Sequence, residues 1–272
     1  MTDYLRHFAL RSAPFTKEID DDELWLPPSR QAVVDGLCEA IAERDSVLLT
    51  GEPGVGKTSI LRALRHRLDH SGVKLTYCHN ATLGRRDFYR QLSVALGLSA
   101  KATAASLFYA VSTHIEELAK ERVHPVFLLD EAQLLHQDTL DHLHILLNYG
   151  WDSRALLSIV LIGLPELSDQ LQLRRNRSLY SRLHRRFQIE PLVPSDTTAY
   201  LAHQLERAGG EPDVFVRDAA GLLHEATHGT MRDLNRLASA ALRLAAKQRL
   251  KIIDREIVLN VIERDPAQQE AA

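Results

Sequence analysis

Residues 46–58, SVLLTGEPGVGKT, constrain the fold more than any other stretch of this chain. An apolar run leads into the pattern G-x-x-x-x-G-K-T, and the SILRALR that follows reads as a helix. Glycines let a backbone wrap a polyphosphate, and free N–H groups at the start of a helix point at negative charge. A strand, a glycine loop and a helix in this order predict a nucleoside triphosphate site rather than a chance glycine turn.

The residues of this phosphate loop have separate expected tasks. The Lys57 ammonium would reach the β- and γ-phosphates, and the Thr58 hydroxyl would ligate Mg²⁺. The predicted nucleotide contacts are Gly51, Glu52, Pro53, Gly54, Val55, Gly56, Lys57, Thr58 and Ser59.

A second motif, VFLLDE at residues 126–131, places two acids at the end of an apolar run. A strand buried on both faces explains the apolar run, and ligands bind at the carboxyl ends of such strands. Asp130 is expected to hold Mg²⁺, and Glu131 to take a proton from the attacking water. Many strands simply end in an acid at a turn, but this pair follows a complete phosphate loop. ATP is the expected nucleotide, because no Asn-Lys-x-Asp string is present to read guanine.

Composition places the chain among ordinary globular proteins. Its 272 residues can bury a sizeable core, and 45% are apolar and 25% charged. Cys38 and Cys78 form no C-x-x-C pair, which fits a reducing compartment and offers neither a disulfide framework nor a zinc site. The first residues lack a signal-peptide layout, and no apolar run approaches the ~18 residues needed to span a bilayer. We therefore expect a cytoplasmic protein without a membrane partner.

Strands and helices alternate along the first two thirds of the chain, and Pro125 is expected to introduce the third strand. Strands are predicted at 46–50, 73–78, 126–130, 156–162 and 186–191, and helices at 29–44, 85–97, 103–121, 136–149 and 178–184. Near-continuously apolar strands in this alternation predict a three-layer αβα P-loop fold with a five-stranded parallel sheet.

The pattern becomes purely helical after residue 194. Helices are predicted at 195–208, 213–227, 230–248 and 254–264, with Ser29, Ser195 and Asp254 as N-caps of their helices. The predicted domains are an N-terminal strap (1–28) that packs its aromatic residues on the core, a nucleotide-binding α/β domain (29–193), a helical lid domain (194–265) and a disordered tail (266–272).

Several segments spread over most of the chain resemble the AAA+ ATPases, in particular the ExeA-type group. That group includes the general-secretion ATPase and the target-selection ATPases of bacterial transposons. The resemblance is carried by residues 4–15, 25–32, 51–58, 129–133, 160–167 and 229–237.

The resemblance implies roles for three arginines. Arg232 would touch the γ-phosphate within its own subunit, and Arg182, or failing it Arg185, would reach the nucleotide of a neighbouring subunit. Leu164 departs from the family pattern, which has glutamine there, and a leucine side chain cannot hydrogen-bond water or phosphate. The resemblance thus implies a self-assembling ATPase, but one that hydrolyses ATP slowly.

Basic residues gather in three further places. Six arginines lie within 174–186, where they suit subunit contact, DNA contact or a solvated face. Arg236, Arg243, Lys247 and Lys251 are spaced to share one helical face, which suits either a DNA backbone or an exposed helix. Arg85, Arg86 and Arg90 are candidate DNA contacts by resemblance. The histidines His136, His142 and His144 lack metal-ligand spacing, so no metal besides Mg²⁺ is expected.

The resemblance favours a DNA transposition accessory protein that binds double-stranded target DNA and recruits a transposase or integrase. A secretion-type relative would continue into a membrane helix and a periplasmic domain, and this sequence stops at Ala272. Two alternatives stay open: a secretion-pathway-type ATPase that works with a membrane partner, and a slow regulatory ATP switch with little hydrolysis.

Overall fold

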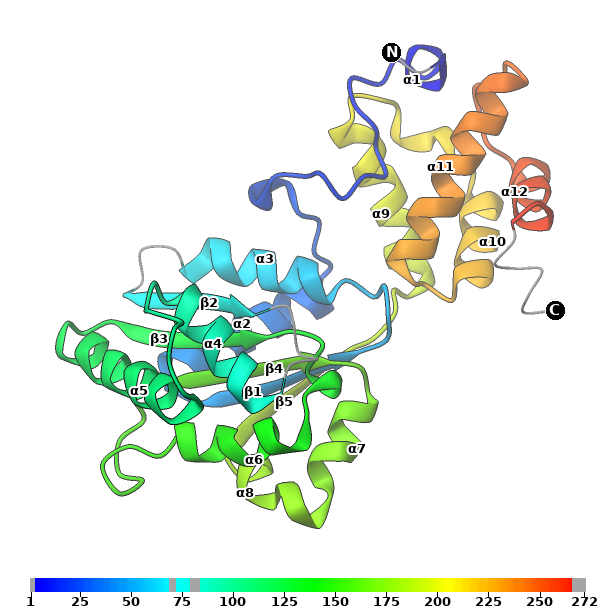
Figure 1. Cartoon of the computed structure of the whole chain (residues 1–272). Coiled ribbons are helices and arrows are strands. Elements are labelled where there is room, and N and C mark those ends of the chain that lie inside the picture. The colour runs from blue at the N-terminus through cyan, green and yellow to red at the C-terminus, as the bar shows by residue number, and fades with distance from the viewer. Residues whose placement is uncertain (1–2, 69–71, 79–83, 266–272) are drawn as a thin grey trace. The chain divides into compact units, whose positions relative to one another are not determined.

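The computed structural model describes residues 3–68, 72–78 and 84–265, and the predicted tail at 266–272 lies outside them. These residues form two compact units (Figure 1). The α/β unit comprises Pro28–Glu52 and Lys57–Ile189. The helical unit comprises the described residues of Met1–Pro27, Pro53–Gly56 and Glu190–Ala272.

The α/β unit is built on a five-stranded sheet with the order β2-β3-β4-β1-β5, and all four strand pairs are parallel. The strands are β1 (Ser46–Gly51), β2 (Val73–Cys78), β3 (His124–Leu129), β4 (Ser158–Gly163) and β5 (Leu183–Ile189). Every residue of β1, β3 and β4 is buried, as expected for inner strands that are covered on both faces. The predicted five-stranded parallel αβα fold is confirmed.

Helices cover both faces of this sheet (Figure 1). On one face lie α2 (Pro28–Ala42) and α3 (Lys57–Leu68), which contact each other and β1. The other face carries α4 (Arg85–Ala95), α5 (Ala104–Lys120), α6 (Gln137–Leu146), α7 (Glu166–Gln172) and α8 (Arg177–Tyr180). Short 3₁₀ helices occur at Asp21–Glu23, Ala132–Leu134, Arg174–Asn176 and Pro212–Val214.

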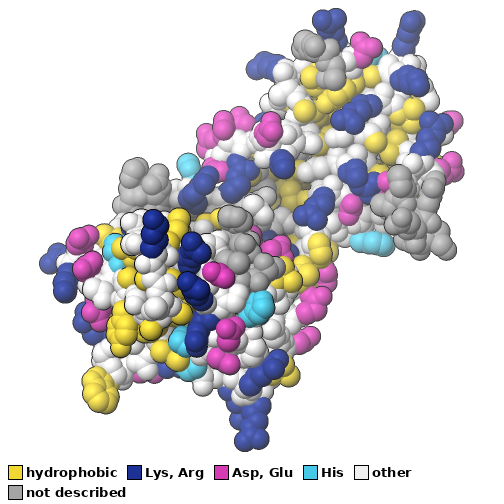
Figure 2. All heavy atoms as spheres, viewed as in Figure 1, with side chains coloured by type: hydrophobic (Ala, Val, Ile, Leu, Met, Phe, Trp, Pro, Cys, Tyr) yellow, Lys and Arg dark blue, Asp and Glu magenta, His cyan; other side chains and the backbone are white. Residues whose placement is uncertain are grey.

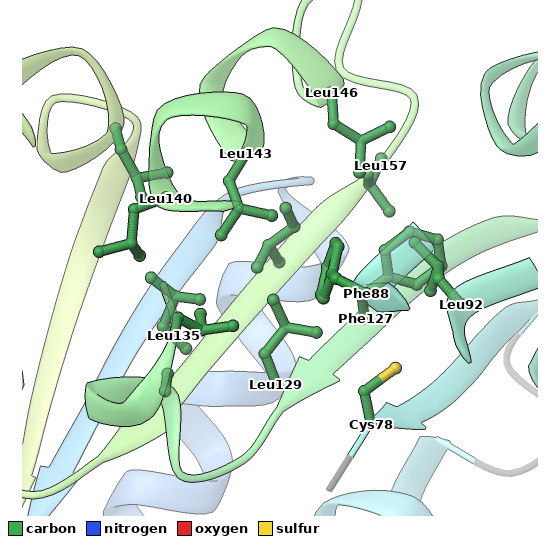
Figure 3. Packing of buried hydrophobic residues seen from close by; sticks show 14 of the residues in the cluster. Cys78, Phe88, Leu92, Phe127, Leu129, Leu135, Leu140, Leu143, Leu146 and Leu157 are labelled. Carbon is green, nitrogen blue, oxygen red and sulfur yellow. The ribbon is translucent and has the colours of Figure 1, made fainter. Parts of the chain in front are cut away.

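The second face is closed by a leucine- and phenylalanine-rich core (Figure 3). Leu140 and Leu143 of α6 point toward the strands, and Phe127 of β3 lies close to Phe88 of α4. Such burial contributes roughly 1.5–3 kcal/mol for each large apolar side chain. The core fixes β3, and with it the position of the two acids that follow this strand.

Several predicted boundaries in the α/β unit are wrong. The helix expected at 178–184 ends at Tyr180, because Leu183 is fully buried and pairs with Ser46 as the first residue of β5. β3 begins at His124, so Pro125 lies inside the strand, one residue before the pairing with β4 starts. Helix α2 begins at Pro28 rather than at a Ser29 N-cap, since proline suits the first turn of a helix.

The helical unit contains α1 (Asp3–His7), α9 (Pro194–Arg207), α10 (Arg217–Thr227), α11 (Met231–Lys247) and α12 (Arg255–Glu263). The N-terminal aromatics Tyr4, Phe8 and Phe15 are buried in its core, and the Trp25 ring lies 5.4 Å from that of Tyr200. The N-terminal segment thus packs on this unit.

Helix starts in this unit show which capping predictions hold. Asp254 is confirmed as an N-cap, because its Oδ1 accepts a hydrogen bond from the Ile257 N–H at 3.1 Å. Ser195 is not an N-cap, since α9 begins one residue earlier at Pro194. No helix in the described part of the chain is long and apolar enough to cross a membrane.

Candidate nucleotide site

The phosphate loop owes its shape to two glycines between β1 and α3. Gly54 and Gly56 have φ values of +83° and +105°, a left-handed region that side chains with a Cβ rarely adopt. Val55 between them is fully buried and anchors the loop. The sequence pattern and the backbone geometry agree that this loop curves tightly.

Lys57 lies at the first position of α3, and its ammonium is folded back over the start of the loop. Its Nζ donates to the Gly51 carbonyl at 2.6 Å and to the Glu52 carbonyl at 3.1 Å. The next residue, Thr58, is exposed to solvent. This position suits a lysine whose ammonium exchanges its main-chain oxygen partners for phosphate oxygens when a nucleotide binds.

Asp130 follows directly after β3 and is held by two hydrogen bonds. Its Oδ2 accepts from the Tyr77 hydroxyl at 2.6 Å, and its Oδ1 accepts from the Glu131 N–H at 2.9 Å. Tyr77 belongs to the neighbouring strand β2, which places its ring beside the end of β3. Burial and then the bond to Asp130 raise the pKa of Tyr77, so the phenol stays a neutral donor. Asp130 is itself only 9% exposed.

Glu131 has a left-handed backbone, with φ 53° and ψ 38°, and an exposed side chain. This conformation is unusual for a residue other than glycine, and such strain gathers at functional sites. Its Oε2 accepts from Gln133 Nε2 at 2.7 Å. The Oε1 atom of Gln133 in turn accepts from the Leu164 N–H at 3.2 Å, just after β4.

These residues fit a magnesium nucleotide. Thr58 and Asp130 offer a hydroxyl and a carboxylate, the oxygen ligands that Mg²⁺ prefers. The two left-handed glycines shape a loop whose N–H groups suit a polyphosphate. The described residues contain no cluster of three or more His, Cys, Asp or Glu side chains that would hold a different metal ion.

Arg232 belongs to the first turn of α11, and its backbone N–H donates to the Gly54 carbonyl at 3.2 Å. Both residues fall in the helical unit, because Pro53–Gly56 cluster with it. A Cβ at position 54 would lie only 2.8 Å from the Cβ of Arg232, so Gly54 is also needed for space. The Arg232 side chain is exposed.

Two arginines are candidates for the residue that reaches the nucleotide of a neighbouring subunit. Both lie at the start of β5, but their hydrogen-bond and ion-pair partners differ. Arg182 donates to Asp152 Oδ2 at 2.9 Å and to the Ser178 carbonyl at 3.0 Å. Arg185 is paired with three carboxylates, those of Glu39, Glu43 and Asp45. Arg185 is thus fixed within its own unit by more partners than Arg182.

The remaining arginines of 174–186 fall into two groups. Arg186 lies over the Tyr180 ring, 4.0 Å from its centroid. Arg174, Arg175 and Arg177 are exposed, and no hydrogen bond or ion pair of their side chains occurs within the described parts of the chain. Among the six arginines of 174–186, these three therefore have side chains without a partner in the described residues.

The predicted basic stripe of four residues is wrong for Lys251, whereas Arg236, Arg243 and Lys247 do belong to α11. The helix ends at Lys247, so Lys251 lies outside it and donates to the His7 carbonyl instead. Arg236 is paired with Asp233 and with the buried Asp265. The charge of Arg236 is thus balanced by one acid of its own helix and one from beyond α12, whereas Arg243 and Lys247 stay exposed on α11.

A second cationic surface follows β2. Arg86 and Arg90 of α4 line a cavity of about 590 Å³ together with Lys101 and the helix-capping Thr103. Figure 2 shows Lys and Arg side chains gathered over this part of the α/β unit. Arg85 points elsewhere, because its Nη1 lies 2.9 Å from His142 Nε2.

Sequence reasoning placed the loop and the acid pair but missed Tyr77 and Gln133, which hold the two acids. Gln133 stood out only as the last residue of the segment 129–133, and nothing in the sequence pairs Tyr77 with Asp130. The roles of the arginines stay predictions.

Comparisons with known proteins give a matching family model and a relative that covers most of the chain. Residues 41–171 match the family model described as "AAA domain". General secretion pathway protein A of Aeromonas hydrophila is 30% identical over 264 residues, which cover 96% of this chain and 48% of that protein. The chain thus spans about half the length of this relative.

Two solved structures are similar in fold. Cdc6p of Pyrobaculum aerophilum matches with a TM-score of 0.70 and 17% identity, over 92% of this chain and 70% of that one. The Drosophila ORC bound to DNA matches with a TM-score of 0.70 and 18% identity, over 99% of this chain and 68% of that one.

Proposed function

We propose that this chain, which carries an AAA domain in the P-loop AAA+ fold, is an ATP hydrolase that assembles side by side. ATP binding would switch its affinity for duplex DNA. The observation that carries the proposal is the acid pair after β3, where Asp130 and Glu131 are each held by a neutral donor. Two oriented carboxylates in a chain with a phosphate loop favour hydrolysis over passive binding.

Each residue of the site has one task in this proposal. The loop N–H groups and Lys57 bind the phosphates, and Thr58 and Asp130 hold Mg²⁺. The bound ion would neutralise charge on the phosphate oxygens. Glu131 takes the proton of the attacking water, for which its exposed carboxylate is placed.

Two variants test the assignment. Lys57→Ala is expected to lose the rise in melting temperature that ATP gives the wild type, because a ligand that binds only the folded state stabilises it. Glu131→Gln is expected to keep that rise and to lose hydrolysis. Unchanged turnover in Glu131→Gln would show that Glu131 is not the base.

Hydrolysis is expected to be slow, because the side chain of Leu164 offers no hydrogen bond. Turnover of the purified protein, measured with and without duplex DNA, separates an ATPase from a regulatory switch that only binds ATP. A rate indistinguishable from that of Glu131→Gln under both conditions would favour the switch.

The proposed self-association would let an arginine of one subunit reach the nucleotide of the next. Arg182 is our first candidate for the residue that completes a neighbour's site, because Arg185 is held by three acids of its own unit. A guanidinium there would stabilise charge spread over the phosphoryl oxygens. Arg232 would contact the γ-phosphate within the same subunit.

Duplex DNA is the proposed ligand of the assembled form. It is supported by the similar fold of the Drosophila ORC bound to DNA and by the exposed cations Arg174, Arg175 and Arg177. Contacts to a DNA backbone need cations but no base readout, and they weaken steeply with salt. We expect ATP-dependent binding to a labelled duplex at low salt that falls off between 50 and 200 mM salt, by roughly 40-fold for three phosphate contacts from one subunit and more for an assembly.

The finer proposal is a DNA transposition accessory protein that recruits a transposase or integrase, as the resemblance to transposon ATPases implies. ATP-dependent co-purification with an integrase-type transposase tests it. The competing proposal, a secretion-type ATPase with a membrane partner, is favoured by the 30% identity to General secretion pathway protein A. Absence of duplex binding at low salt would favour this alternative.

A further inference from the structure

We infer that Gln133 is a positioning residue that fixes the Glu131 carboxylate and ties it to the end of β4. The inference rests on the proposed ATP hydrolysis. It explains how a chain with Leu164 at the end of β4 still connects that strand to the proposed catalytic base.

Both ends of one side-chain amide make this connection. Gln133 Nε2 donates to Glu131 Oε2 at 2.7 Å, and Gln133 Oε1 accepts from the Leu164 N–H at 3.2 Å. The two bonds demand opposite roles, a donor toward the carboxylate and an acceptor toward the N–H group. A flipped amide would place two acceptors and two donors face to face, so only one orientation satisfies both partners.

The Gln133 side chain lies in space that is left free because residue 163 is a glycine. A Cβ at Gly163 would lie 2.6 Å from Gln133 Oε1 and 2.8 Å from Leu167 Cδ2. The backbone of Gly163 is not left-handed, so glycine is needed here because it lacks a side chain and not because of its backbone conformation. The last residue of β4 thus leaves room for the Gln133 amide.

Glu131 is a residue that needs such support. It has an exposed side chain on a left-handed backbone, and a free glutamate would sample many rotamers. The bond from Gln133 occupies Oε2, whereas Oε1 has no hydrogen bond within the described residues. One oxygen is therefore held while the other stays available to accept a proton from water.

The polar link to β4 runs through the backbone of residue 164 and not through its side chain. Leu164 contributes only its N–H group, which every residue except proline possesses. The connection therefore tolerates different side chains at position 164 and depends on the amide at position 133.

The test uses the full-length chain with three variants. Gln133→Met keeps the length of the side chain without its polar atoms, and Gln133→Glu keeps an acceptor for the Leu164 N–H but loses the donor to Glu131. Gln172→Met, the same change at an exposed glutamine of α7, is the matched control. We expect both Gln133 variants to lower kcat about tenfold or more, a loss usual for a misplaced catalytic group. Their KM for ATP and their ATP-induced rise in melting temperature should stay within about twofold of the wild type, and Gln172→Met should keep the wild-type kcat.

Three results would overturn the inference. They are a kcat for Gln133→Met close to the wild type, a parallel loss of kcat and ATP binding, and a rise in kcat, which would mean that Gln133 restrains Glu131. Glu131→Gln separates this failure from that of the proposed function. If Glu131→Gln is inactive and Gln133→Met is active, only the positioning role is wrong; if Glu131→Gln is active, the proposed base is wrong as well.

Discussion

At the scale of single residues, His124 is a buried base at the start of β3. Its Nε2 lies 2.9 Å from Ser158 Oγ, and burial, with a smaller effect of Arg44, lowers the pKa of His124 from 6.5 to about 4. Between these values the unfolded chain binds a proton that the folded chain does not. Stability is therefore fully present above pH 6.5 and falls as the pH drops toward 4.

We expect this one residue to lower the free energy of unfolding by about 2 kcal/mol between pH 7.5 and pH 5. His124→Gln should flatten that part of the pH dependence, measured as the urea midpoint at several pH values. His66→Gln, at an exposed histidine of α3, is the control. An equally steep pH dependence in His124→Gln would assign the effect to other groups.

Asp254 tests a local capping bond in the helical unit. Its side chain accepts from the Ile257 N–H, one of the N–H groups that the first turn of α12 leaves without a helical partner. Asp254→Ala should lower the free energy of unfolding by about 1 kcal/mol in urea denaturation. Asp20→Ala is the matched control, because Asp20 also precedes a helix but makes no capping bond. Equal effects of the two changes would contradict the cap.

At the scale of elements, the turn between α6 and β4 presents a fully exposed indole. Trp151 is 100% exposed, whereas Trp25 packs against Tyr200. Trp151 and Asp152 both have left-handed backbones, and Arg182 braces the turn through Asp152. The turn therefore holds the indole in water.

Fluorescence separates the two tryptophans. Trp25→Phe leaves only Trp151, and we expect acrylamide to quench its emission strongly and the emission to lie at long wavelength. Trp151→Phe leaves Trp25, for which weaker quenching is expected since its ring is partly covered. Similar quenching constants in the two variants would show that the turn is not exposed as described.

Elements with strong patterns could be predicted from sequence, and their edges could not. The continuous apolar runs predicted β1, β3 and β4, because a strand that is buried on both faces is apolar along nearly its whole length. β5 lies at the edge of the sheet, and its outward residues are polar, so its start at Leu183 was placed three residues late. Pairing with Ser46 sets that start, and such a contact joins residues far apart in the sequence.

The candidate site likewise has parts that could be predicted from the sequence and parts that could not. The loop and the acid pair are local patterns, so their positions after β1 and β3 could be predicted, while their roles stay predictions. Tyr77 lies 53 residues from Asp130, and Gln133 lies 31 residues from Leu164. Contacts over such separations depend on strand order, which a single sequence does not state. The ion pair between Arg236 and Asp265 was hidden because it depends on how α11 packs against α12 in the helical unit.

At the scale of the whole molecule, we propose that a second copy of the chain would complete the nucleotide site. If Arg182 of one subunit serves the nucleotide of its neighbour, Glu131→Gln and Arg182→Ala fail for different reasons. The first variant retains a working arginine, and the second retains a working base. Neither is expected to hydrolyse ATP alone, although both should bind it.

Mixing the two inactive variants should restore hydrolysis. In a mixture of equal parts, half of the sites retain Glu131, and half of those face an intact Arg182, so roughly a quarter of the wild-type rate is expected from random assembly. A mixture of Glu131→Gln with the double variant carrying both changes has no complete site and should stay inactive. Asp152→Ala controls for the lost brace, because it removes the partner of Arg182 and keeps the guanidinium. No recovery at any mixing ratio, with both variants still assembling, would place Arg182 outside the shared site.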